Sequence, residues 1–89
     1  MPVVVHLPGP LTAFAGGHAR LPLSGPRSVG EALRALPPGV RDRVMDEQGR
    51  VRPHVNVFVG SESIRDTGGL ETPLGGEAEL HIIAAVSGG

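Results

Sequence analysis

The last two residues, Gly88 and Gly89, have the clearest possible chemical use in this sequence. We expect the α-carboxylate of Gly89 to be the true C-terminus. Glycine has no Cβ, so such a tail fits a narrow channel and follows extended paths that are closed to other residues. A carboxylate on this tether can enter another protein's active site, where a leaving group such as AMP would make it electrophilic. The pair predicts a chain whose C-terminus is activated by a partner enzyme.

The Gly-Gly pair alone is weak evidence, because glycine makes up 14 of the 89 residues and chain ends are often rich in small residues. Composition narrows the remaining chemistry. Without cysteine there is no disulfide, thiolate metal site or cysteine nucleophile. All eight basic side chains are arginines, so the chain has no lysine for Schiff-base chemistry or for accepting an isopeptide bond. No Ser, His and acid set or carboxylate pair has convincing spacing, so we expect a protein that is not itself an enzyme.

The charge and hydropathy patterns exclude other classes of function. The net charge is −1 and the arginines form no run, so nucleic-acid binding is not expected. No apolar segment reaches the roughly 18 residues needed to span a bilayer. Residues 3–7 are too short for a signal-peptide core and follow no basic residue. We therefore expect a cytoplasmic protein with no membrane partner.

The first half of the chain predicts two strands and two helical segments. Residues 3–7 are β-branched and lead to a turn at 8–10. Residues 19–23 alternate like a strand, and Pro22 makes it an edge strand. Ser28 and Glu31 form a capping box, in which we expect the Ser28 hydroxyl to accept from the amide of Glu31 and the Glu31 side chain to reach the amide of Ser28.

The predicted helix has one apolar face and ends at 37–39. Val40, Val44 and Met45 suggest a second short helical turn, followed by a loop over 46–50. Residues 54–59 form the clearest strand, in which alternate valines face the helix. An irregular, turn-rich crossing from 60 to 71 leads to a last strand over 79–85.

Terminal strands that flank a helix usually lie side by side and parallel. The element order therefore predicts an α+β fold of the β-grasp (ubiquitin-like) type, with a mixed sheet and one main helix on one face. We expect a single domain over 1–89 with a flexible C-terminal tail at 85–89, and a monomer in the absence of partners.

The sheet face without the helix offers candidate contacts for a partner. Alternation places Phe58, Ile83 and Ala85 on this open face, where an outward aromatic residue would anchor an activating enzyme. The alternative is that Phe58 is half-buried against the 60–74 crossing. Arg65 would either contact a partner near the tail or form a solvated ion pair with Asp66, and Gly68 and Gly69 would serve backbone conformation.

Three histidines, His6, His54 and His81, are also expected on the open face by alternation. If the last strand lies between the other two, they could form a row. We expect solvated surface histidines and no metal.

Three stretches resemble the ThiS/MoaD family of ubiquitin-like sulfur carriers, and more closely its CysO-type carriers of thiocarboxylate-dependent cysteine synthesis. They read RPHVNVFV at 52–59, IRDTGGLETPL at 64–74 and AVSGG at 85–89. The resemblance covers the whole chain and is thinner over residues 8–27. It implies that Val86 and Ser87, together with the open face, contact partners.

The resemblance also implies a defined cycle. An E1-like enzyme adenylates the Gly89 carboxylate with ATP, a sulfur donor converts it to a thiocarboxylate, and this group passes its sulfur to a substrate on an acceptor enzyme. In cysteine synthesis the acceptor is an aminoacrylate on a PLP enzyme. The ATP and PLP belong to the partners, and no cofactor is expected on this chain.

Two other function classes stay open. A ubiquitin-like modifier would be joined to target lysines through Gly89, and a β-grasp interaction module would leave the tail inert. Within the carrier class, molybdopterin, thiamine and thiosugar or other secondary-metabolite thiolation are alternatives to cysteine synthesis.

Overall fold

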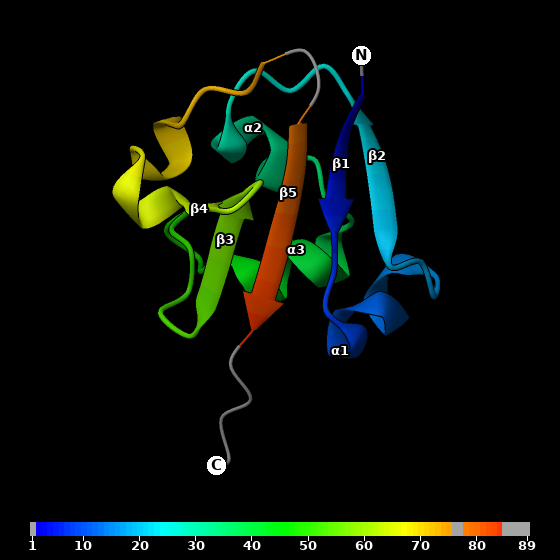
Figure 1. Cartoon of the computed structure of the whole chain (residues 1–89). Helices are drawn as coiled ribbons and strands as arrows, with labels where there is room; N and C mark the ends of the chain where they lie inside the picture. Colours follow the sequence, from blue (N-terminus) through cyan, green and yellow to red (C-terminus); the bar gives the residue numbers. More distant parts are fainter. Residues whose placement is uncertain (1, 76–77, 85–89) are drawn as a thin grey trace.

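A computed structural model describes residues 2–75 and 78–84 and shows a mixed five-stranded sheet with helices packed on one face (Figure 1). The strands are β1 (Pro2–His6), β2 (Arg20–Ser24), β3 (Val55–Val59), β4 (Glu62–Ser63) and β5 (Ala78–Ala84). The helices are α1 (Gly9–Thr12), α2 (Val29–Arg34) and α3 (Pro38–Val44), with 3-10 turns η1 (Ala13–Ala15), η2 (Ile64–Asp66) and η3 (Gly69–Glu71). The predicted β-grasp fold is confirmed.

The last strand, β5, lies in the middle of the sheet, whose order is β2-β1-β5-β3-β4. It runs parallel to β1, with Val5 opposite Leu80, and antiparallel to β3, with Val57 opposite Ile82. The predicted parallel pairing of the two terminal strands is therefore confirmed. β1 pairs with the first part of β5, residues 78–81, and β3 pairs with its second part, residues 80–84, so each part of β5 is held by a neighbouring strand.

The edge strand and the segment before it show one confirmed prediction and one error. β2 lies at the sheet edge, antiparallel to β1, with Pro22 opposite Val4. The turn predicted at 8–10 instead begins a short helical segment, α1 followed by η1. Pro10 suits the first helical turn, where a missing N–H costs nothing, and Leu11 is buried against the core.

The capping box at the start of α2 is confirmed in one half. The amide of Glu31 donates to Ser28 Oγ over 3.2 Å, as predicted. Glu31 Oε1, however, accepts from the amide of Arg27 over 3.0 Å rather than from that of Ser28, so the return contact reaches one residue further out. The second helical turn is confirmed as α3, which begins with Pro38 and ends at Val44.

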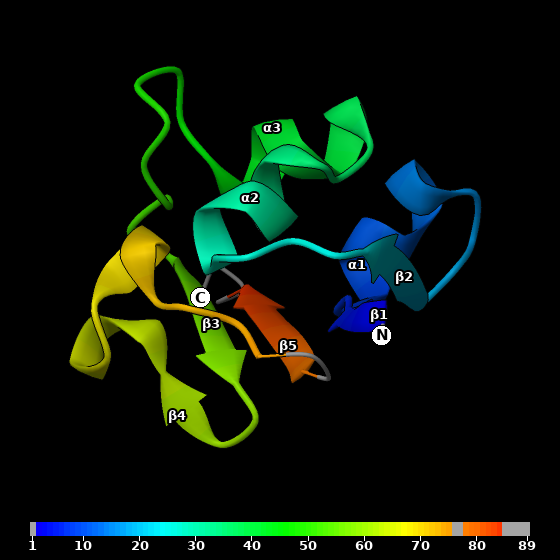
Figure 2. The same ribbon diagram turned by 90° about the horizontal axis from the view of Figure 1, so that it is seen from above.

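The hydrophobic core lies between the sheet and the two helices α2 and α3, which cover the same face (Figure 2). The largest fully buried side chains come from β1, β3 and β5 and from α2 and α3; they are Leu33, Leu80, Val3, Val5, Val29, Val40, Val44, Val55 and Val57. The valines at 55 and 57 face the helices, as their alternation predicts. None of the helices in the described part of the chain covers the opposite face, which is the open face of the sheet.

The crossing from β4 to β5 is fastened to the start of α2. The amide of Val29 donates to the carbonyl of Thr72 over 3.0 Å, and the amide of Leu74 to that of Arg27 over 2.9 Å. Gly68 and Gly69 have φ values of 122° and 64°, which L-residues rarely adopt. The prediction that they serve backbone conformation is confirmed. None of the helices described is long and apolar enough to cross a membrane.

Candidate functional site

The carboxyl end of β5 is the base from which the C-terminal tail departs. Ala84, the last residue that the structure describes, lies opposite Val55 on β3. The predicted tail residues Ala85, Val86, Ser87, Gly88 and Gly89 all lie outside the described residues. The carboxyl end of β5 is paired with β3 as far as Ala84, whereas its pairing with β1 ends at His81, so β3 fixes the direction of this end relative to the open face of the sheet (Figure 1).

A row of side chains crosses the open face near this end of the molecule. The strand register places His6 opposite His81, His81 opposite Phe58, and Phe58 opposite Ser63. Ile83 lies two residues further along β5 and is 51% exposed. In the described part of the chain, it and Phe14 are the two large hydrophobic residues that are exposed. Both predicted anchors, Phe58 and Ile83, therefore do lie on the same face.

Phe58 lies on the open face, as the first alternative expected, but it is half-buried there, as the second expected. It lines a shallow groove of about 550 Å³ together with Pro8, His81 and Ile83. The groove gives a partner both an apolar floor and imidazole groups that form hydrogen bonds. Its role in partner binding remains a prediction, but its composition is that of a protein contact with an apolar centre and a polar rim.

Arg65 makes contacts that differ from the expected ion pair. Its guanidinium NH2 group donates to the backbone carbonyls of Pro53 and Val55, each over 3.2 Å. No ion pair between Arg65 and Asp66 is found among the described residues, so that interpretation is wrong. Because Val55 lies opposite Ala84, Arg65 fastens the start of β3 beside the point where the tail departs.

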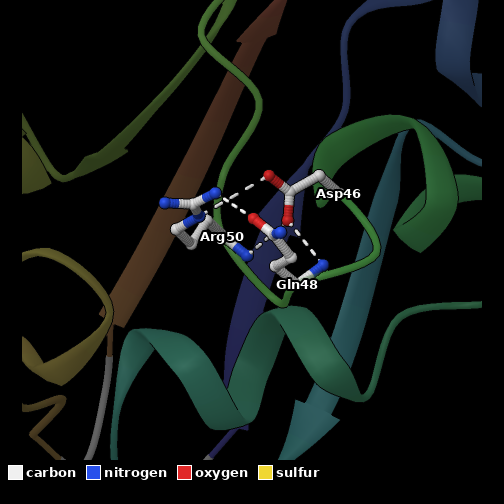
Figure 3. A network of polar contacts seen from close by, with 3 residues as sticks. All are labelled: Asp46, Gln48 and Arg50. Atoms are coloured by element: carbon white, nitrogen blue, oxygen red, sulfur yellow. Dashed lines mark hydrogen bonds and ion pairs between the residues drawn. The ribbon is translucent and has the colours of Figure 1, made fainter.

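The loop from α3 to β3 is organised by one carboxylate, as Figure 3 shows. Asp46 Oδ1 accepts from the amides of Gln48 and Arg50, each over 2.9 Å. These contacts, with that of the Arg50 amide contributing most, hold the pKa of Asp46 below its ordinary value. The Arg50 side chain also hydrogen-bonds to Gln48 Oε1.

Arg50 and Arg65 flank an apolar pocket of about 210 Å³ that sequence reasoning missed. Its apolar walls come from the loop before β3, from β3 and from the β4–β5 crossing; they include Val51, Val57, Ile64 and Leu70. Turns separate these four positions from one another, so no periodic pattern in the sequence marks the pocket.

The histidine row is confirmed in part. The rings of His6 and His81 stack, with centroids 4.4 Å apart and planes 10° from parallel. His54 precedes the first residue of β3 and is exposed, so it does not join them. Glu79 does: its Oε1 lies 2.6 Å from His6 Nε2. Glu79 and His81 are two residues apart on β5, so alternation places both side chains on the open face. The same alternation in the sequence could have identified Glu79 as a neighbour of the histidines.

Comparison with known proteins identifies the family. No protein-family model matches the sequence. The sulfur carrier protein CysO of Mycobacterium tuberculosis is 33% identical over 93 residues, and the match covers all of both chains.

Two solved structures extend this comparison. CysO in the crystal structure of the Amycolatopsis orientalis BexX/CysO complex superposes with a TM-score of 0.87 at 29% identity, covering 98% of this chain and 99% of that one. Small archaeal modifier protein 1 (SAMP1) of Methanosarcina acetivorans gives 0.82 at 32% identity, covering 99% and 96%. On full-length identity, shared fold and the position of the Gly-Gly pair beyond a central strand, this chain belongs to the CysO family of ubiquitin-like sulfur carriers.

Proposed function

We propose that the chain carries sulfur as a thiocarboxylate on Gly89 and delivers it to an acceptor enzyme in cysteine synthesis, without being an enzyme itself. The observation that carries the proposal is the position of β5. This central strand is paired with β3 as far as its last residue, Ala84, and Gly89 follows five residues later. Five extended residues span at most about 17 Å, which is enough to place a carboxylate inside a partner's active site while the sheet stays at the surface.

The open face supplies the second part of the proposal, a docking surface that orients the tail. Phe58 and Ile83 lie on this face, and Ile83 directly precedes Ala84, where β5 ends. An activating enzyme that covers these side chains would gain their apolar burial. It would also receive the tail in a fixed direction, since the same strand carries Ile83 and leads into the tail.

The proposed chemistry takes place on the partners. A Gly89 carboxylate oxygen attacks the α-phosphorus of ATP held by an E1-like enzyme, and pyrophosphate leaves. Sulfide sulfur from a donor then attacks the acyl carbon of the adenylate, and AMP leaves with the electron pair of the bond that joined it to that carbon. The resulting thiocarboxylate attacks the acceptor substrate through its sulfur. A partner enzyme then cleaves with water the bond that still joins the product to Gly89, which releases the sulfur-containing product and restores the carboxylate. No residue of this chain other than the terminus takes part in bond making, and ATP and PLP remain with the partners.

The acceptor and the location are further parts of the proposal. Cysteine synthesis follows from the likeness to CysO, and molybdopterin, thiamine or thiosugar thiolation remain alternatives because the acceptor enzyme selects the substrate. A complex of the A. orientalis CysO with BexX shows that a related carrier forms a stable assembly with another protein. We propose a cytoplasmic carrier that is monomeric between such encounters.

The adenylation step is tested by the exchange of labelled pyrophosphate into ATP with an E1-like enzyme of the same family. We expect exchange that requires the chain, disappears when Gly88 and Gly89 are deleted, and persists in a His18→Asn control, which changes an exposed side chain in the loop before β2. Exchange that is unaffected by the deletion would refute activation at Gly89.

A second candidate function is protein modification. It is favoured by the likeness to SAMP1 of Methanosarcina acetivorans, whose name describes a modifier. The tail and its activation would be shared by both functions. The chain contains no lysine, so it could modify targets but not form chains on itself through lysine. Conjugates that carry this protein in a cell extract, lost on deletion of Gly89, would support modification; their absence, with exchange intact, would leave the carrier function alone.

A further inference from the structure

The open face carries a cluster of three metal-binding side chains that the carrier function does not use. We propose that His6, Glu79 and His81 form a binding site for one divalent transition-metal ion of the zinc class. One nitrogen from each histidine and one carboxylate oxygen of Glu79 all lie within 4.8 Å of one another. They come from two adjacent parallel strands, β1 and β5, so the backbone that carries them is fixed by the sheet.

The donor atoms are close enough to converge on one ion. In a tetrahedral zinc site with bonds of about 2.0–2.1 Å, neighbouring donor atoms lie about 3.3 Å apart. His6 Nε2 and Glu79 Oε1 are already 2.6 Å apart, and the imidazoles stack with centroids 4.4 Å apart. Rotation of the rings about χ2, whose energy profile is broad in histidine, brings their nitrogens toward a common point at low cost.

The donor set defines the class of ion. Two imidazoles and one carboxylate are typical of zinc and its neighbours in the first transition row, whereas Mg²⁺ and Ca²⁺ prefer oxygen donors alone. To coordinate through Nε2, the His6 ring takes the tautomer that carries its proton on Nδ1, so the imidazole stays neutral. Glu79 supplies one negative charge. The guanidinium of Arg20, opposite His6 on β2, belongs to an exposed residue at the sheet edge, where solvent and salt screen its repulsion.

Three protein donors leave at least one coordination position open to solvent. His81 lies directly opposite Phe58 in the row across the open face, so this position faces the same side as the proposed docking surface. A docked protein could fill it with a donor of its own. The metal site is nevertheless a property of this chain alone and does not depend on the carrier function.

The test uses the full chain without an affinity tag, in a buffer that does not chelate metals. Zinc binding is measured by calorimetry, and cobalt is used as a spectroscopic substitute whose visible absorption reports the coordination. We expect one equivalent to bind, with shifts in the imidazole NMR signals of His6 and His81 but not of His54. Loss of an outer-shell partner alone weakens metal sites about 10- to 100-fold, so His81→Asn and Glu79→Gln should each weaken binding at least tenfold.

The matched control is His54→Asn, which removes an exposed histidine that lies outside the cluster. Its affinity for zinc should equal that of the unmodified chain. The proposal is overturned if no zinc binds, if His54→Asn weakens binding as much as His81→Asn, or if the imidazole signals of His6 and His81 do not shift. The NMR result is obtained on the unmodified chain, so it decides the question even if a variant fails to fold.

Discussion

Two neighbouring isoleucines on β5 separate the stability of the fold from its proposed use. Ile82 is 2% exposed and faces the core, whereas Ile83 is 51% exposed on the open face. Substitution by alanine removes the same side-chain atoms at both positions. If the open face is a docking surface, Ile82→Ala should destabilise the protein and Ile83→Ala should instead weaken binding of the activating enzyme.

The magnitudes follow from burial. Removing a fully buried isoleucine side chain to alanine costs about 2–5 kcal/mol, and each kcal/mol lowers Tm by about 4–8 °C in a domain of this size. Ile82→Ala should therefore lower Tm by roughly 8–40 °C. Full burial of an isoleucine is worth about 1.5–3 kcal/mol. The exposed half of Ile83 then contributes roughly 0.7–1.5 kcal/mol to a complex that covers it, which is about a 3- to 12-fold change in Kd.

The assay combines thermal unfolding of the free chain with calorimetric titration against the activating enzyme. Ile83→Ala should change Tm by only a few degrees and raise Kd by the factor above. An unchanged Kd for Ile83→Ala would refute the docking surface, and a loss of Tm as large as that of Ile82→Ala would refute the assignment of Ile83 to the open face.

Three further predictions concern the elements that hold the site. Ser28→Ala removes the cap of α2 and should cost about 1 kcal/mol of unfolding free energy, whereas Ser28→Thr keeps the hydroxyl; equal stability of the two variants by chemical denaturation would contradict the capping role. Titration by NMR should show a pKa of Asp46 below its ordinary value, so ionised Asp46 stabilises the fold above its unfolded-state pKa, and this stabilisation is lost as pH falls through the lower folded-state pKa. Asp46→Asn should therefore lower the free energy of unfolding at neutral pH and not in strong acid. An effect of the substitution that does not depend on pH would contradict this prediction. Arg65→Met keeps the aliphatic stem but removes the bonds to Pro53 and Val55. It should cost about 1 kcal/mol and speed hydrogen exchange at the start of β3, where unchanged exchange would show that the anchor is unimportant.

Much of the fold could be predicted because local patterns and tertiary packing agree. The alternating valines at 55 and 57 mark one buried strand face, and Pro22 marks a strand that needs no partner on its outer side. Ser28 marks the start of a helix through a contact three residues away. Each of these signals lies within a few residues of its effect, so the sequence alone is sufficient to find it.

The errors arise where distant segments decide the outcome. Pro8, Gly9 and Pro10 are typical of a turn, but burial of Leu11 makes a helical segment there favourable. One of the two alternatives for Arg65 was an ion pair with its neighbour Asp66, but its guanidinium bonds instead to carbonyls ten and twelve residues earlier. His54 has the right parity for the histidine row but precedes the strand, while Glu79 joins the row through the register of β1 and β5.

The central claim is that Gly89 carries sulfur, and the intact mass of the protein tests it most directly. After incubation with an E1-like activating enzyme, ATP and a sulfide source, replacement of one carboxylate oxygen by sulfur should raise the mass by about 16 Da. The gain should be absent when Gly89 is deleted and present in the His54→Asn control. An unchanged mass, with an activating enzyme that charges another carrier of the family under the same conditions, would contradict the account.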